Sequence, residues 1–149
     1  MPIHQDWTVV DEEKYCSVTC WVPLQNTTEE NGAIQVIPGS HKFSNALRSP
    51  TLPVSFTEIY ADLKPYLKTL NLKAGEAFLF NHALMHASHP NLSKKDRVAV
   101  TYGFMQTEAD LSMYYYNKGE VKLYAMPDDM FLDYPSIREE AKIGTLVKS

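Results

Sequence analysis

The sequence has little cysteine, no excess of basic charge and no long apolar run, and each shortage excludes a class of partner. Fourteen Lys and Arg against eighteen Asp and Glu give a net charge of −4. No overall positive field therefore attracts nucleic acid or an anionic membrane surface. No apolar run approaches the roughly 18 residues of a membrane-spanning helix. We expect neither nucleic acid nor a membrane as a partner.

The two cysteines, Cys16 and Cys20, lie four positions apart in a strand-like run. At about 3.3 Å per residue they would be about 13 Å apart, which is beyond disulfide reach. We therefore expect two buried thiols in a reducing compartment. The first six residues lack the basic start and the apolar stretch of a signal peptide. Together these features predict a cytoplasmic protein.

Short strands separated by turn residues dominate the first hundred positions. The length of 149 residues predicts one domain. Period-two alternation or short apolar runs predict strands over 15–24, 33–37, 77–80, 84–88 and 97–104. Turn residues at 31–32, 38–40 and 74–76 separate several of them. This spacing predicts a mostly β fold, a sandwich or barrel of the jelly-roll type.

The stretch from 41 to 70 and the C-terminal part differ from this strand pattern. Pro65 interrupts the only helical spacing before residue 70, so we expect a short, interrupted helix in a long excursion. Near the C-terminus, two apolar runs flank residues 117–119 and predict a hairpin. Residues 136–142 are compatible with a terminal helical turn.

His4 and Asp6 are two positions apart, so on a strand both side chains leave the same face. By itself this pair is a weak motif, because an exposed strand also carries it by chance. A third ligand from a distant strand would complete a facial triad of two His and one carboxylate. Three candidates lie downstream: His82, His86 and His89.

Arg97 begins the predicted strand 97–104, eleven positions after His86. If His86 ends one strand and Arg97 begins its antiparallel neighbour, the guanidinium can reach the cavity that holds the metal. A planar, permanently charged fork suits a dicarboxylate co-substrate. The alternative is a surface residue paired with Asp96 or Glu76.

Five ordered runs resemble the phytanoyl-CoA dioxygenase family of iron(II)- and 2-oxoglutarate-dependent oxygenases. They lie at 4–6, 30–42, 75–80, 84–88 and position 97, in the family's order and spacing. The resemblance implies a double-stranded β-helix with a core over about 2–105 and an extension over 106–149. It also implies that His4, Asp6 and His86 bind iron. His82 is then expected to line the pocket or to lie just behind the metal ligands, and His89 to be a loop residue.

The same resemblance assigns a co-substrate pocket. Arg97 would bind the distal carboxylate of 2-oxoglutarate, and Ser88 would hydrogen-bond that carboxylate. Gln5 and Trp21 match family positions that line the pocket.

The implied activity uses iron(II), 2-oxoglutarate and dioxygen, and releases succinate and carbon dioxide while a small organic substrate is hydroxylated. Related halogenases carry a small residue where Asp6 stands, so hydroxylation is the expected outcome. Two alternatives stay open. One is a metal- and 2-oxoglutarate-binding β-barrel of the same family without turnover. The other is a structural jelly roll in which the three ligands never converge.

Family members are usually longer, with a helical region and a first core strand ahead of the His-x-Asp run. Only three residues precede it here, so the chain is a fragment, a partial reading frame or a minimal form. A core without its first strand has an open sheet edge. We expect that edge to pair with a second copy of the chain, as a homodimer, or to be covered by residues 111–125.

Overall fold

The computed structural model describes residues 1–43, 46–127, 129 and 144–148. The chain divides into two compact units. The first takes the described residues of 1–6, 18–45 and 55–104, and the second those of 7–17, 46–54 and 105–149. The first unit ends at residue 104, and the expectation of one domain with a core over about 2–105 stays a prediction. The second unit, however, also takes two segments from within that predicted core.

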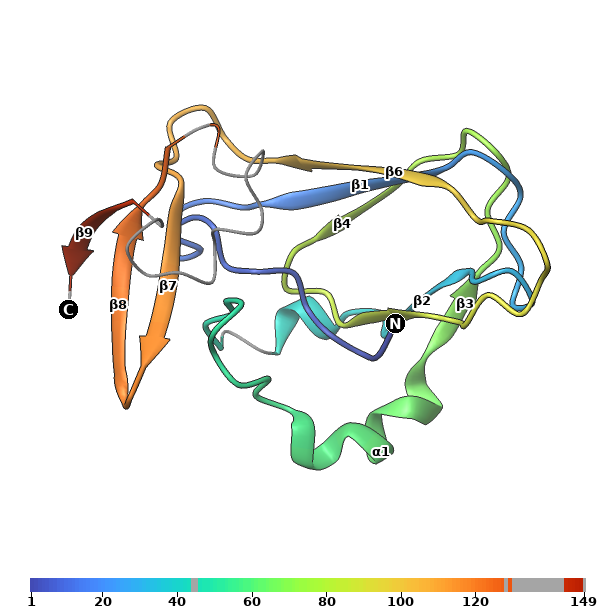
Figure 1. Cartoon of the computed structure of the whole chain (residues 1–149), viewed down its shortest axis with the longest axis horizontal. Coiled ribbons are helices and arrows are strands. Elements are labelled where there is room, and N and C mark those ends of the chain that lie inside the picture. The colour runs from blue at the N-terminus through green and yellow to red at the C-terminus, as the bar shows by residue number, and fades with distance from the viewer. Residues whose placement is uncertain (44–45, 128, 130–143, 149) are drawn as a thin grey trace. The chain divides into compact units, whose positions relative to one another are not determined.

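Two antiparallel three-stranded sheets form the first unit (Figure 1). One has the order β4-β1-β6, with β1 (Val18–Pro23) between β4 (Phe78–Asn81) and β6 (Ala99–Phe104). The other has the order β3-β2-β5, with β2 (Ile34–Val36) between β3 (Lys68–Leu70) and β5 (His86–Ser88). Apolar side chains of both sheets and of the connection between β4 and β5 pack into one cluster: Trp21, Ile34, Val36, Phe80 and Leu84. The predicted jelly-roll class is confirmed.

The buried face of β1 carries the side chains of Thr19 and Trp21, which are 5% and 9% exposed. Cys16 is exposed and Cys20 is half-buried, and both are free thiols. The prediction of two buried thiols is therefore wrong, although the alternation itself is present. The prediction failed because the inward face of β1 lines a pocket, where polar and aromatic side chains replace small apolar ones.

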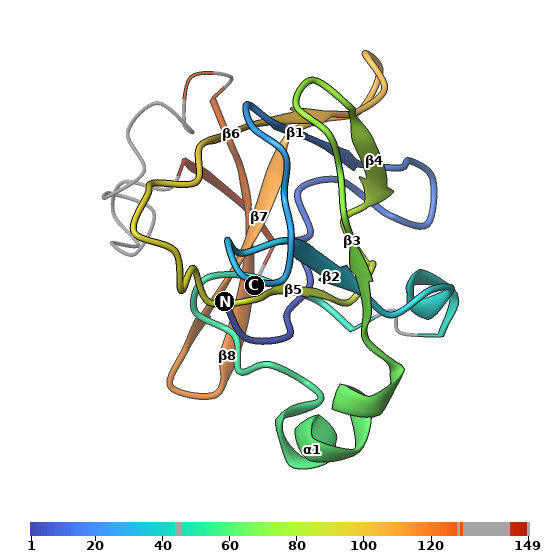
Figure 2. The same cartoon turned by 90° about the vertical axis from the view of Figure 1, so that its right-hand side faces the viewer.

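The excursion before β3 contains the predicted short, interrupted helix. A 3-10 turn (Thr57–Ile59) leads into α1 (Tyr60–Leu63), and a second 3-10 turn (Lys64–Tyr66) contains Pro65. This segment leads into β3 (Figure 2). Tyr60 packs against a buried cluster that includes Ile3, and its hydroxyl accepts a hydrogen bond of 2.8 Å from the Ile3 backbone N–H. The excursion thereby fixes the N-terminal segment. No helix among the described residues is long and apolar enough to cross a membrane.

The second unit has a sheet of its own with the order β7-β8-β9, formed by Ser112–Asn117, Glu120–Ala125 and Thr145–Lys148. The predicted hairpin is confirmed, since β7 and β8 pair antiparallel and turn at Lys118 and Gly119, both with positive φ. Among the described residues, β7, β8 and β9 pair with one another and add no strand to a sheet of the first unit. Pairing of the core edge with a second copy stays a prediction. The helical turn expected over 136–142 lies outside the described residues.

Candidate metal centre

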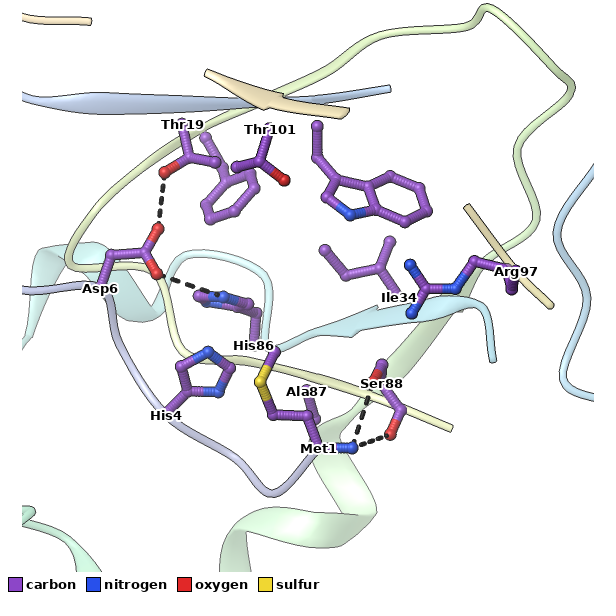
Figure 3. A pocket seen from close by; sticks show the side chains of 12 residues that line it. Met1, His4, Asp6, Thr19, Ile34, His86, Ala87, Ser88, Arg97 and Thr101 are labelled. Atoms are coloured by element: carbon purple, nitrogen blue, oxygen red, sulfur yellow. Dashed lines mark hydrogen bonds and ion pairs between the residues drawn. The ribbon is translucent and has the colours of Figure 1, made fainter. Parts of the chain in front are cut away.

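His4, Asp6 and His86 lie together, with one ligand atom of each within 4.8 Å of the others. Figure 3 shows the three side chains at one end of a pocket in the first unit. His4 and His86 form an isolated antiparallel bridge, in which each backbone N–H donates to the other's carbonyl at 2.9 Å. The Asp6 N–H donates to the His82 carbonyl, also at 2.9 Å. Backbone pairing thus brings the distant histidine beside the His-x-Asp run.

Both histidine rings are oriented by backbone carbonyls. The Nδ1 of His4 lies 2.9 Å from the Pro2 oxygen, and the Nδ1 of His86 lies 2.9 Å from the Leu84 oxygen. A carbonyl only accepts, so each Nδ1 carries the proton and each Nε2 keeps its lone pair. This is the tautomer that a metal-binding histidine needs.

The pKa of His86 is lowered from its ordinary value of 6.5. Burial is the largest cause, since the residue is 4% exposed, and the neighbouring His4 adds to it. The two ring centroids are 4.1 Å apart, so a second positive charge there is unfavourable. The Asp6 carboxylate acts in the opposite direction. The net effect keeps His86 neutral near pH 7, which is the form that binds a metal.

The two carboxylate oxygens of Asp6 have different surroundings. Thr19 donates its hydroxyl hydrogen to Oδ2 at 2.6 Å. Oδ1 lies 3.7 Å from the Nε2 of His86. Oxygen and nitrogen ligands of one divalent ion each lie about 2.0–2.2 Å from it, so a separation of 3.7 Å suits two ligands that share one ion.

Arg97 reaches the same pocket from the loop before β6. The predicted arrangement, in which His86 ends a strand and Arg97 begins its antiparallel neighbour, is wrong. β5 and β6 belong to different sheets, and His86 begins its strand. The guanidinium carbon lies 5.4 Å from the centre of the Trp21 ring. Its Nε is buried and has no hydrogen-bond partner among the described residues. No ion pair of the described residues joins Arg97 to Asp96 or Glu76.

Trp21 and Ser88 line the pocket together with Arg97. The Ser88 hydroxyl accepts a hydrogen bond of 3.1 Å from the Met1 amino group. Gln5 is not among the lining residues. It is buried, and its amide nitrogen donates to the Ala83 carbonyl at 2.6 Å. Successive side chains of an extended segment point to opposite faces. His4 and Asp6 line the pocket, so Gln5 between them points away from it.

Neither of the two competing histidines joins the cluster of ligand atoms among the described residues. His82 is buried, and its carbonyl fixes the Asp6 backbone. His89 follows β5, and its Nε2 lies 2.9 Å from the Thr69 hydroxyl. His89 is therefore a loop residue, in agreement with the prediction.

Thr19 is the site residue that the sequence analysis missed. A threonine in a strand is ordinary, and its partner Asp6 lies thirteen positions away. A signal was nevertheless present, because Trp21 was assigned to the pocket and Thr19 stands two positions before it. Residues i and i+2 of a strand share a face, so Thr19 had to face the same pocket.

The pocket has a volume of about 190 Å³ and is lined by side chains of both sheets. Pockets for drug-sized ligands are larger, about 300–1,000 Å³. The space next to the three candidate ligands therefore suits a small co-substrate, with two imidazoles and a carboxylate at one end and a guanidinium at the other.

Comparison with known proteins agrees with this arrangement. A sequence model of the phytanoyl-CoA dioxygenase family matches residues 1–99. The chain belongs to this family. One relative is the phytanoyl-CoA dioxygenase domain-containing protein 1 homolog of Dictyostelium discoideum, which is 32% identical over 124 residues. The match covers 77% of this chain and 43% of the relative, so the chain spans less than half the length of that relative.

Solved structures support the fold assignment. The non-heme alpha-ketoglutarate-dependent carbocyclase SnoK from nogalamycin biosynthesis superposes with a TM-score of 0.61 at 18% identity, covering 99% of this chain and 52% of that one. HygX from Streptomyces hygroscopicus, crystallised with nickel, 2-oxoglutarate and hygromycin B, gives a TM-score of 0.52 at 21% identity. That match covers 72% of this chain and 50% of HygX. At these identities the likeness establishes the fold.

Proposed function

We propose that this chain forms the iron(II)- and 2-oxoglutarate-binding part of a dioxygenase that hydroxylates a small organic molecule. The observation that carries the proposal is the convergence of His4, Asp6 and His86 within 4.8 Å. Two imidazoles and one carboxylate are the facial triad of non-heme iron(II) oxygenases, which leaves coordination positions open. Family membership and the cofactors named for HygX support it.

The residues present fit the metal. Each histidine has its Nδ1 bound to a backbone carbonyl, which leaves Nε2 as the ligand atom. Burial and His4 lower the pKa of His86, so no proton has to be removed from it near neutral pH. Asp6 supplies the negative charge that partly balances a divalent cation.

The residues at the other end fit a dicarboxylate. Arg97 offers a permanently charged fork, and its buried Nε has no partner among the described residues. Leaving such a donor unpaired is costly, and a carboxylate oxygen would satisfy it. Trp21 supports the guanidinium through its ring face. Ser88 lines the same pocket and offers a hydroxyl to the same carboxylate.

Iron, 2-oxoglutarate and dioxygen together supply the oxidation, which yields succinate and carbon dioxide and places one oxygen atom on the substrate. The protein's own residues hold and orient these groups. His4, Asp6 and His86 fix the metal at one end, and Arg97 sets the distance to the distal carboxylate. Because the carboxylate of Asp6 occupies the position that a halide would need, the residues favour hydroxylation over halogenation.

The test is an anaerobic titration of the chain with iron(II) and 2-oxoglutarate, followed by exposure to air. We expect a visible charge-transfer band from the chelated 2-oxo acid, and then release of succinate. Glutarate is the matched control, because it has both carboxylates but lacks the 2-oxo group, and it should give no band. A band without succinate would favour the alternative of a binding domain without turnover. Absence of iron binding would exclude the proposed site.

Three further expectations stand as predictions beside this proposal. They are the cytoplasmic location, the homodimer formed through an open sheet edge, and the identity of the substrate as a small organic molecule. Light scattering tests the second directly.

A further inference from the structure

The hydroxyl of Thr19 donates to Asp6 Oδ2 at 2.6 Å, a short distance for a hydrogen bond between a hydroxyl and a carboxylate. Thr19 is 5% exposed, so water competes little for this contact. A threonine hydroxyl carries a single hydrogen, and here that hydrogen is used on the carboxylate. The contact therefore fixes which oxygen of Asp6 faces the two histidines.

The backbone that carries Thr19 is fixed on both sides. Thr19 is paired with Phe80 of β4 and with Gly103 of β6, so it lies on the central strand of its sheet. The backbone of Asp6 is held separately, through its bond to the His82 carbonyl. The carboxylate thus lies between two anchored backbones, and the contact with the hydroxyl restricts its side-chain torsions, including the terminal one. That torsion is broad in an unrestrained aspartate.

We propose that Thr19 is a positioning residue that holds Asp6 with a single oxygen, Oδ1, directed toward the metal. With Oδ2 held by the hydroxyl, Oδ1 lies 3.7 Å from His86 Nε2. Without the hydroxyl, the orientation of the carboxylate is not fixed in advance, so a divalent ion would have to order it and would bind more weakly. The inference rests on the proposed function, since it concerns the same metal site.

Two substitutions test whether the hydrogen bond or the packing of the side chain matters. Val has nearly the same shape as Thr and a high strand propensity, so a Thr19→Val chain keeps the strand and loses the donor. A Thr19→Ser chain keeps the donor and loses only a methyl group. The two substitutions separate the hydrogen bond from the volume of the side chain. Thr101 provides a more exposed control, because it lines the same pocket and none of the side-chain hydrogen bonds of the candidate ligands among the described residues involves it.

The experiment measures nickel(II) affinity of the chain by calorimetry, without co-substrate. Removing a partner that orients a metal ligand typically lowers affinity 10- to 100-fold. We expect a loss of about 10-fold or more in Thr19→Val, affinity within about threefold of the parent in Thr19→Ser, and no change in Thr101→Val. The absorption spectrum of the cobalt(II) form should change in Thr19→Val alone, because it reports the coordination geometry. Thermal unfolding of the metal-free chains checks that each variant folds.

The outcomes separate the two proposals. If the parent binds nickel and Thr19→Val binds it equally well with the parent's cobalt spectrum, the positioning role is wrong and the metal site stands. Equal losses in Thr19→Val and Thr19→Ser would also overturn the role, because the donor would not be what matters. If the parent binds no nickel, both this inference and the proposed function fail.

Discussion

At the metal end of the pocket, each candidate ligand side chain has a hydrogen bond to the protein, whereas at the other end a buried nitrogen of Arg97 has none among the described residues. The histidines are held by carbonyls and Asp6 by a hydroxyl. The guanidinium of Arg97 lies over the face of the Trp21 ring. The ligand side chains at the metal end are thus oriented before an ion arrives, while the guanidinium end has a buried donor that a bound ligand can satisfy. The difference predicts separate effects on metal and co-substrate affinity.

The largest effect is expected at the metal end. Asp6→Ala removes the only carboxylate of the cluster, and two imidazoles alone hold a divalent ion weakly. We expect stoichiometric iron(II) binding to be lost, a decrease of more than about 100-fold, since even partners outside the coordination sphere contribute 10- to 100-fold. Anaerobic titration measures it, with Asp62→Ala in α1 as the exposed control. Retained stoichiometric binding in Asp6→Ala would remove the assignment.

The second effect concerns the guanidinium end. Arg97→Lys keeps the charge but loses the bidentate fork. We expect 2-oxoglutarate affinity to fall by about 1.5–3 kcal/mol, the range for hydrogen bonds to charged groups, while nickel affinity stays within about twofold. Calorimetry of 2-oxoglutarate with the nickel-loaded chain gives the first value and nickel titration the second. Unchanged co-substrate affinity would show that another residue binds the distal carboxylate.

A smaller effect comes from Gly32, where the backbone passes close to Arg97. Its φ is +90°, and a Cβ there would lie 3.3 Å from the His89 carbonyl oxygen and 3.6 Å from Arg97 Nε. Gly32→Ala should lower the free energy of unfolding by about 1–3 kcal/mol and weaken 2-oxoglutarate binding more than nickel binding. Gly39→Ala is the matched control, with φ +81° and no atom within 4 Å. If both variants bind 2-oxoglutarate like the parent, Gly32 acts on the backbone alone.

The smallest effect is a pH dependence at the metal end. Because the pKa of His86 is lowered by burial and by His4, the unfolded chain takes up a proton before the folded one does. Stability of the metal-free chain therefore decreases as pH falls below the ordinary histidine value of 6.5, by at most about 1.4 kcal/mol per pH unit for this one proton. Urea unfolding between pH 7.5 and 5 is the measurement, over a window chosen around that value. His86→Gln should lose this contribution and His41→Gln should keep it.

Local patterns predicted much of the fold and two of the three metal-ligand candidates. The strands around Val18–Pro23 and Ala99–Phe104, the hairpin at Lys118 and the interruption at Pro65 follow from alternation, turn chemistry and the missing proline donor. His4 and Asp6 are linked by their spacing alone. His86 required the family resemblance, because chain spacing does not show that its backbone pairs with His4.

The errors share one physical origin. The sequence rule places apolar residues inside, but β1 turns Thr19 and Trp21 inward and leaves Cys20 half-buried, because a pocket needs polar and aromatic walls. Arg97 was placed on a strand beside His86, although it enters from the loop before β6. Both points depend on how distant strands pair and how the two sheets pack. A two-residue period or a turn motif describes only neighbouring residues and does not show this.

The reciprocal backbone bonds between His4 and His86 join two points of the chain that are roughly 80 residues apart. In the unfolded chain, bringing such distant ligands together costs about 4 kcal/mol of loop-closure entropy. An ion held by both histidines would therefore bind the folded chain almost exclusively, and its binding energy would add to folding. At a free metal concentration of 100 times Kd, the gain is about 2.7 kcal/mol. A chelator is then expected to lower the unfolding temperature of the metal-loaded chain.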